Sequence, residues 1–100
     1  MLDSGFPTIV RAANDAKLPV FSFMSNSPER GAVLAVARDY FDAGREGAHV
    51  AAQVLRGADP AKIPLTDMKT TRVVINLENA KRLGVKIPES LLKRADHVIE

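Results

Sequence analysis

Apolar residues recur at helical spacing near the start of the chain. Phe6, Ile9 and Val10 lie three and four residues apart, which places them on one face of a helix. Pro7 is compatible with a first helical turn, where a backbone N–H has no helical partner in any case. The pattern predicts a helix over residues 4–17.

Two short apolar runs follow, PVFSFM at residues 19–24 and AVLAVA at residues 32–37. Continuous apolar runs of this length are typical of parallel strands that are buried on both faces. We therefore expect two adjacent parallel strands. The residues between them are loop-forming, and Pro28 and Gly31 leave room for at most one helical turn.

A long helix is predicted after the second run. Asp39 is a good N-cap, and Gly57 supplies the stop. One stripe of this helix consists mostly of small residues, including Gly44, Gly47 and Ala51. Each glycine costs about 1 kcal/mol relative to alanine in a helix. We therefore expect the stripe to approach another backbone closely, most simply that of a sheet.

The last third of the chain predicts a loop, a strand and two helices. Residues 58–64 contain two prolines and are expected to form an ordered surface loop, and residues 71–75 are β-branched and strand-like. Asn76 can cap a helix over residues 77–83. A final helix is expected from Pro88, with the apolar face Leu91, Leu92, Ala95, Val98 and Ile99. These elements indicate an α/β layer fold with too few strands to be complete in one small sheet.

Composition and charge exclude several classes of function. The 100 residues allow one compact domain, and 14 Lys and Arg against 12 Asp and Glu give a net charge of only +2. The cations are not clustered, so we expect no nucleic-acid partner. The absence of cysteine excludes disulfides, a thiolate zinc site and a cysteine nucleophile. No apolar run is long enough to span a membrane, and we find no export signal in this chain.

The sequence contains no recognisable catalytic or cofactor motif. Phosphate-binding glycine loops and a Gly-x-Ser-x-Gly nucleophile motif are absent, so we expect neither an enzyme nor a cofactor. Glu46 and His49 form one possible metal-binding arm without a second one, so no metal site is expected. We expect both His49 and His97 to be solvated.

Polar residues follow both predicted apolar strands. Ser25 and Asn26 come after the first strand, and Asp39 and Tyr40 come after the second. Open α/β sheets bind ligands in the crevice outside the carboxyl ends of their strands, so these four residues are candidate ligand contacts. Simpler roles remain open. The first pair can form a turn that only reverses the chain, and Asp39 can be a plain helix cap with Tyr40 packed against the sheet.

Longer motifs resemble one known family. They are RDY at residues 38–40, VLRGADPAKIP at residues 54–64, VINLENAKRLG at residues 74–84 and IPESLL at residues 87–92. In this order they resemble the carboxyl-terminal third of the ABC transporter substrate-binding proteins, the family that includes tryptophan- and tyrosine-type uptake proteins. The resemblance covers nearly the whole chain.

The resemblance implies a type I periplasmic-binding-protein fold, in which two Rossmann-like lobes close on a ligand. Residues 1–38 and 70–100 would belong to one lobe, and residues 39–69 would form the hinge and the long helix of the other. The family also has a first lobe and an export signal, so the chain is expected to be a truncated, carboxyl-terminal fragment.

The implied function is that of the solute-binding component of an ABC-type importer. A small polar ligand such as an amino acid would bind in the interlobe cleft through Ser25, Asn26, Asp39 and Tyr40. An ABC permease would be the partner of the intact protein, in the periplasm or on the outer side of the membrane. The small-residue stripe also needs a surface to pack on, so we expect the isolated fragment to form a homo-oligomer.

Two other functions fit the same pattern less well. A ligand-sensing domain of a transcription regulator can have the same two-lobed fold. An enzyme fragment with a doubly wound sheet is the third alternative, and the missing phosphate loop and nucleophile argue against it.

Overall fold

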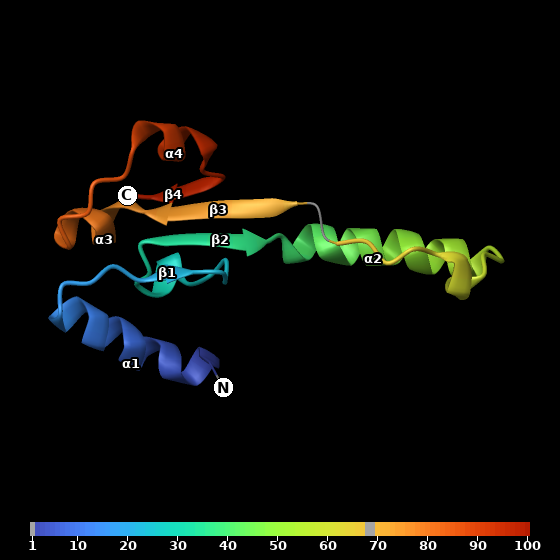
Figure 1. Ribbon diagram of the computed structural model, residues 1–100, viewed down its shortest axis with the longest axis horizontal. Helices are drawn as coiled ribbons and strands as arrows, with labels where there is room; N and C mark the ends of the chain where they lie inside the picture. The colour runs from blue at the N-terminus through green and yellow to red at the C-terminus, as the bar shows by residue number, and fades with distance from the viewer. Residues whose placement is uncertain (1, 68–69) are drawn as a thin grey trace. The chain divides into compact units, whose positions relative to one another are not determined.

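The computed structural model describes residues 2–67 and 70–100. The elements, shown in Figure 1, are α1 (Leu2–Asp15), β1 (Phe21–Ser22), η1 (Pro28–Arg30), β2 (Leu34–Arg38), α2 (Tyr40–Leu55), η2 (Pro60–Lys62), β3 (Thr71–Asn76), α3 (Leu77–Arg82), α4 (Glu89–Arg94) and β4 (His97–Ile99). None of the helices in this part of the chain has both the length and the apolar character needed to cross a membrane. The α/β fold class predicted from the sequence is confirmed.

The chain divides into two compact units. Unit 1 consists of Met1–Ala37 and Arg72–Glu100, and unit 2 consists of Arg38–Thr71. The chain therefore passes from unit 1 to unit 2 at the end of β2 and returns at the start of β3. The assignment of residues to two lobes of a larger protein stays a prediction.

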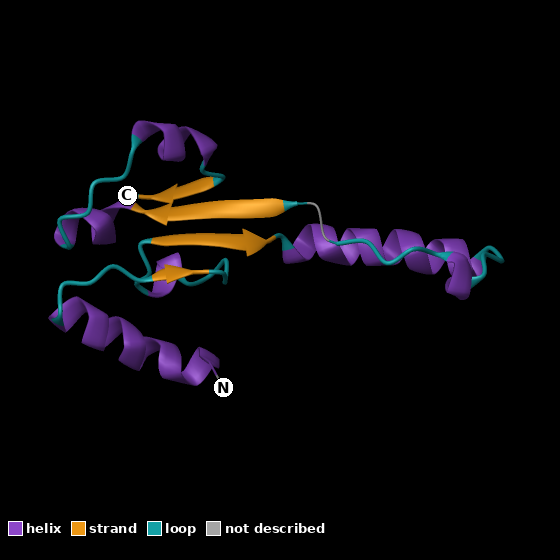
Figure 2. Ribbon diagram, viewed as in Figure 1, coloured by secondary structure: helices purple, strands orange, loops and turns teal. Residues whose placement is uncertain are grey.

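Unit 1 contains one four-stranded sheet in the order β1-β2-β3-β4. β1 and β2 are parallel, with Phe21 opposite Leu34, and β3 and β4 are parallel, with Val74 opposite His97. The two pairs point in opposite directions in Figure 2, so the sheet as a whole is mixed. The prediction that residues 19–24 and 32–37 contribute adjacent parallel strands is confirmed.

The prediction that both apolar runs are buried on both faces was wrong. β1 has only two residues and is an edge strand, and Phe21 and Phe23 are 60% and 70% exposed. β2 alternates, because Ala35 and Ala37 are buried while Val36 is 49% exposed. An edge strand has one neighbour, and one face of this sheet is open at Val36, so neither strand has the cover that its sequence predicts.

The chain ends in a strand and not in a helix. α4 (Glu89–Arg94) stops at Ala95, which has an extended backbone with ψ of 133°. The Asp96 N–H donates to the Val73 carbonyl over 2.8 Å, and the Asp96 Oδ2 accepts from the Val73 N–H over 2.7 Å. Residues 97–99 then pair with β3. The free edge of β3 thus outweighs the helical periodicity, because a strand there satisfies backbone groups that a helix would leave unpaired.

The core of unit 1 forms where α1 meets the start of β2. Phe6 and Val10 are buried and cluster with the fully buried Ala32. The Arg30 guanidinium carbon lies 5.2 Å from the centre of the Phe6 ring, a cation–π contact that closes one side of the cluster. The predicted helix is confirmed. Its expected apolar face is narrower, since Ile9 is 49% exposed.

Unit 2 consists of α2, η2 and the extended segments around them. The predicted long helix, its Asp39 cap and the stop at Gly57, where φ is +106°, are confirmed. None of the residues of α2 is buried, and a Cβ placed on Gly44 or Gly47 would have no neighbour within 4 Å. The described residues therefore do not contain the backbone that the small-residue stripe was expected to approach.

Candidate ligand-binding site

A polar hollow of about 160 Å³ lies at one end of the sheet of unit 1. We call it the polar hollow. Its lining residues are Ser25, Asn26, Glu29, Arg72, Val74 and His97. All of them belong to unit 1. They come from the loop after β1, from η1 and from the two strands β3 and β4.

The strand residues of the hollow share one face of the sheet. Successive side chains of a strand point to opposite faces, so Arg72, Val74 and Asn76 lie on the same side of β3. His97 is paired with Val74 in the parallel register and therefore lies on that side too. Val74 is only 3% exposed, whereas Arg72 and His97 are exposed. A buried valine thus forms the base of the hollow, with two nitrogen-rich side chains at its rim.

The loop that faces these strands is held by hydrogen bonds of its own. The Ser22 and Ser27 hydroxyls lie 2.8 Å apart, and the Ser22 Oγ also accepts from the Met24 N–H over 3.1 Å. Ser27 is completely buried. The hydroxyl contact between Ser22 and Ser27 therefore holds the backbone of Ser25 and Asn26 from both sides. Breaking this contact would leave the buried Ser27 hydroxyl unpaired and destabilise the protein.

Two buried amides fasten η1 to the opposite end of β3. The Asn76 Nδ2 donates to the Pro28 carbonyl over 2.8 Å, and its Oδ1 caps α3 by accepting from the Asn79 N–H over 2.9 Å. The Asn79 Nδ2 donates to the Gly31 carbonyl. The predicted capping role of Asn76 is confirmed. The same side chain also holds in place the short helix that carries Glu29.

The polar hollow contains two of the four ligand contacts that were predicted from the sequence, together with residues that were not predicted. Ser25, which is half-buried, and the exposed Asn26 both line the polar hollow. Glu29, Arg72 and His97 were not nominated, and His97 was expected only to be solvated. Arg72 and His97 come together through the pairing of β3 with β4, and the sequence pattern had predicted a helix in place of β4.

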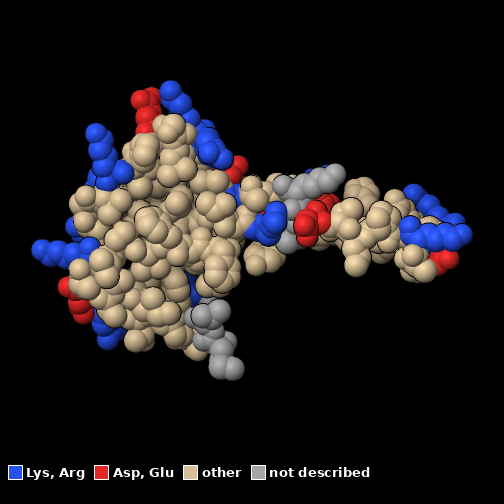
Figure 3. Space-filling model, in the orientation of Figure 1, with Lys and Arg blue, Asp and Glu red and all other residues tan. Residues whose placement is uncertain are grey.

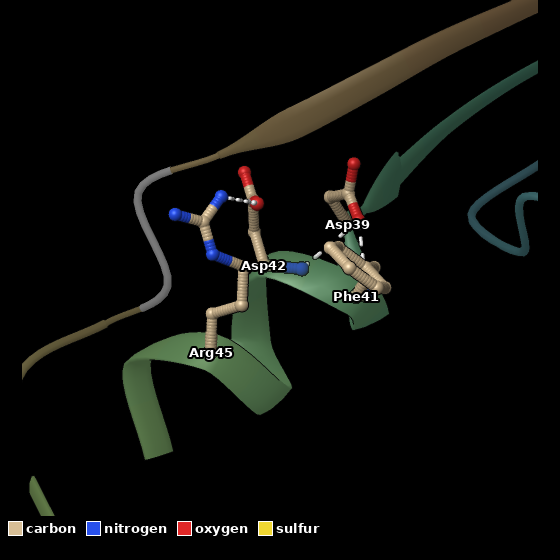
Figure 4. A network of polar contacts seen from close by, with 4 residues as sticks. All are labelled: Asp39, Phe41, Asp42 and Arg45. Atoms are coloured by element: carbon tan, nitrogen blue, oxygen red, sulfur yellow. Dashed lines mark hydrogen bonds and ion pairs between the residues drawn. The ribbon is translucent and has the colours of Figure 1, made fainter. Parts of the chain in front are cut away.

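Asp39 and Tyr40 lie in unit 2, where Asp39 is the N-cap of α2 and Tyr40 is its first residue. Figure 4 shows Asp39 at the start of this helix. The Asp39 Oδ1 accepts from the Phe41 N–H over 3.0 Å and from the Asp42 N–H over 3.2 Å. Both capping bonds end on Oδ1, so Oδ2 is not needed for the cap. Asp39 is half-buried, and its own N–H donates to the Thr70 carbonyl over 3.1 Å. Asp39 therefore caps α2 through Oδ1, and its Oδ2 remains available for another partner.

The side chains around Asp39 are largely in solvent. Tyr40 is 66% exposed, so within the described residues it does not pack against a sheet as the alternative reading required. Glu46 and His49 are exposed on the charged face of α2, where the Arg45 Nη1 and the Asp42 Oδ1 lie 3.7 Å apart. Across residues 2–67 and 70–100, no cluster of three or more His, Cys, Asp or Glu side chains could hold a metal ion.

Unit 2 also contains an apolar groove of about 350 Å³ between α2 and the segment after η2. We call it the apolar groove. It is lined by Ala43, Glu46, Gly47, Val50, Val54, Pro60, Ile63, Pro64, Leu65 and Thr66. Leu65 is fully exposed and Val50 is 43% exposed. The groove shares Gly47 with the small-residue stripe of α2, and most of its other lining residues are apolar.

Charged side chains are unevenly distributed on unit 1. In the view of Figure 3, Lys, Arg, Asp and Glu lie around the margin of unit 1, and the centre of its visible face carries none of them. This face therefore has no continuous basic surface of the kind that binds nucleic acid.

Comparison with known proteins places the chain in a family. The sequence matches the family described as ABC transporter substrate binding protein over residues 1–99. The chain belongs to the ABC transporter substrate-binding protein family. The resemblance seen in the motifs of residues 54–64 and 74–84 is thereby confirmed.

Individual proteins are similar to this chain over most of its length. The tyrosine-binding protein of Clostridioides difficile strain R20291 is 28% identical over 86 residues, which are 86% of this chain and 25% of that protein. The crystal structure of an ABC domain in complex with L-Trp from Streptococcus pneumoniae is 39% identical, with a TM-score of 0.82, over 98% of this chain and 34% of that one. A conserved domain protein from Vibrio cholerae is 35% identical, with a TM-score of 0.84, over 97% and 33% of the two chains.

A third solved structure shares the fold at lower identity. It is the ligand-free, open form of a substrate binding protein with adhesive properties from Clostridium difficile, with 23% identity and a TM-score of 0.75 over 98% of this chain and 32% of that one. This ABC substrate-binding chain thus spans between a quarter and about a third of the length of its relatives.

Proposed function

We propose that this chain is part of the solute-binding component of an ABC-type importer and that it binds an amino acid in a cleft between two lobes. The observation that carries the proposal is the family match over residues 1–99, together with 39% identity to a domain solved in complex with L-Trp. In this proposal residues 1–38 and 70–100 belong to one lobe and residues 39–69 to the hinge and the other lobe. The protein binds its ligand and catalyses no reaction.

The mechanism is closure of the two lobes on the ligand. A ligand that contacts both lobes favours the closed state, because only that state makes all the contacts. An ABC permease then recognises the closed form on the outer side of the membrane, in the periplasm or beside a membrane anchor. The chain passes between the two units only at residues 37–38 and 71–72, and these two positions are suitable hinges.

The residues nominated from the sequence have the chemistry that an amino acid requires. Ser25 and Asn26 present a hydroxyl and an amide from a loop that hydrogen bonds hold in place. The Asp39 Oδ2 is available for an ammonium group, and the exposed Tyr40 can flank the ligand. The family match to transport proteins favours this function over a sensor domain of a transcription regulator.

Isothermal titration calorimetry on the protein at its full natural length tests the proposal. L-Tryptophan and L-tyrosine are titrated first, since relatives carry these names, followed by the other amino acids. We expect saturable binding of at least one of them with a one-to-one stoichiometry. A correctly folded protein that binds none of the amino acids would contradict the proposed function.

The variant Asp39→Asn tests the ammonium contact. Asn also caps helices, so the fold is expected to persist, while the loss of a charge-assisted hydrogen bond weakens amino-acid binding by roughly 1.5–3 kcal/mol. Asp59→Asn is the matched control, because Asp59 caps η2 through the Ala61 N–H in the same way. Unchanged affinity in Asp39→Asn would reduce Asp39 to a helix cap. Ser25→Ala then tests the remaining polar contacts.

A further inference from the structure

Opposite charges line the polar hollow without neutralising each other. Arg72 and Glu29 both border it, and neither side chain forms an ion pair or a hydrogen bond with another described residue. The His97 ring is likewise without such a partner among residues 2–67 and 70–100. A cation and an anion that share a hollow but remain apart are suited to a ligand that lies between them.

The hollow has the size of a subsite and not of a whole ligand pocket. Its volume of about 160 Å³ is below the roughly 300–1,000 Å³ of pockets that enclose a complete small molecule. It can therefore hold the head group of a ligand whose side chain lies outside. The arginine guanidinium is the cation best suited to a carboxylate, because its planar fork can donate two parallel hydrogen bonds.

The other donors around Arg72 favour the same group. His97 lies beside it on the neighbouring strand, and Ser25 and Asn26 contribute a hydroxyl and an amide from the facing loop. The Asn76 bond to the Pro28 carbonyl and the burial of Ser27 keep this loop at a fixed place over β3. The backbone that carries Ser25 and Asn26 is thus held in place before any ligand arrives, which lowers the entropic cost of binding.

We propose that the polar hollow is the carboxylate subsite of an amino-acid ligand, with Arg72 as its main donor, and that Glu29 makes the subsite prefer a zwitterion over an anion. The inference rests on the proposed function, in which Asp39 binds the ammonium group. Arg72 and Glu29 together give the hollow no net charge. Glu29 repels the carboxylate of any ligand, and the ammonium group of a zwitterion offsets this repulsion, whereas a ligand with a carboxylate alone has no such offset.

The variant Arg72→Gln tests the carboxylate contact in the protein at its full natural length. L-Tryptophan and L-tryptophanamide are the probes, since the amide keeps the shape and the ammonium group but loses the carboxylate charge. The same comparison is made with L-tyrosine and L-tyrosinamide. We expect Arg72→Gln to weaken binding of the acids by about ten- to a hundredfold and to change binding of the amides little. Arg72→Lys, which keeps the charge, restores part of the loss.

The control is Arg94→Gln, the same change at an exposed position of α4 outside the hollow. It is expected to leave both affinities unchanged. An Arg72→Gln protein that still prefers the acids over the amides as strongly as the wild type would overturn the inference. A wild-type protein that binds neither acids nor amides contradicts the proposed function itself, and the carboxylate subsite falls with it.

The variant Glu29→Gln tests the preference for zwitterions. We expect it to raise the affinity for 3-(indol-3-yl)propionate, which lacks the ammonium group, severalfold relative to that for L-tryptophan, in keeping with the modest strength of exposed charge interactions. Glu78→Gln, at an exposed position on α3, is the control. If the ratio of the two affinities is the same in Glu29→Gln and wild type, Glu29 has no part in specificity.

Discussion

Gly31 combines two constraints that no other residue type satisfies as well. It ends η1 with φ of +115°, in the left-handed region that side chains with a Cβ rarely adopt. A Cβ placed there would also lie 2.5 Å from the Val10 Cγ1, in the core formed with α1. Gly57 shares only the first constraint, since its φ is +106° and nothing lies within 4 Å of its Cβ position.

The two glycines therefore give a matched pair of variants. Gly57→Ala is expected to lower the free energy of unfolding by about 1 kcal/mol, the cost of the left-handed conformation alone. Gly31→Ala adds overpacking against Val10 and is expected to cost roughly 2–4 kcal/mol in total. Urea denaturation measures both, and Val10→Ala in the Gly31→Ala background should recover part of the loss. Equal effects of the two alanines would show that the Val10 contact does not matter.

At the residue scale, the helix caps could be predicted from the sequence, whereas the meeting of Arg72 and His97 at the polar hollow could not. Asp39 and Asn76 carry short acceptors directly before a helical pattern, so local physics is enough to identify both as caps. Arg72 and His97 have no local signal of this kind. They meet only because β4 pairs with β3, and that depends on which backbone groups the rest of the fold leaves unpaired.

At the element scale, the carboxyl-terminal segment shows how packing can override periodicity. The apolar residues at positions 91, 92, 95, 98 and 99 fit one face of a helix. The last two of them, Val98 and Ile99, also fit a short strand, because periodicity alone does not distinguish the two structures over so few residues. The structure ends the helix at Arg94 and uses Asp96 to join Val73 through two hydrogen bonds. The side-chain bond thus fixes the point where β4 begins.

Variants of Asp96 test this junction. Asp96→Ala removes the acceptor of the Val73 N–H, so we expect faster hydrogen exchange at that amide, by roughly fivefold for a bond worth about 1 kcal/mol. Asp96→Asn keeps an acceptor oxygen and should retain most of the protection. Nuclear magnetic resonance exchange measurements resolve the single amide. Equal protection of Val73 in the two variants would contradict the assigned role of the side chain.

At the scale of the whole molecule, the apolar groove and the small-residue stripe of α2 predict association. Val50 and Leu65 expose apolar surface along the groove, and none of α2 is buried. The relatives are about three to three and a half times as long as this chain, so they contain additional polypeptide that could cover such a surface. The fold class and the family could be predicted from the motifs of the chain, whereas the partner that covers the apolar groove could not.

Light scattering on the 100-residue chain tests the prediction. We expect dimers or larger species whose proportion rises with concentration, because an exposed apolar groove is stabilised by burial. Val50→Ser combined with Leu65→Ser should shift the chain towards monomer. Ile9→Ser, at an exposed apolar position of α1 outside the groove, is the control. A monomer that unfolds cooperatively at all concentrations would contradict it.

The most direct test of the proposed function is a crystal structure of the protein at its full natural length, grown with the amino acid that binds most tightly in calorimetry. We predict the ligand carboxylate within hydrogen-bond distance of Arg72, its ammonium group on the Asp39 Oδ2, and the loop of Ser25 and Asn26 beside them. A well-ordered amino acid bound at a place that none of these four residues touches would contradict the account.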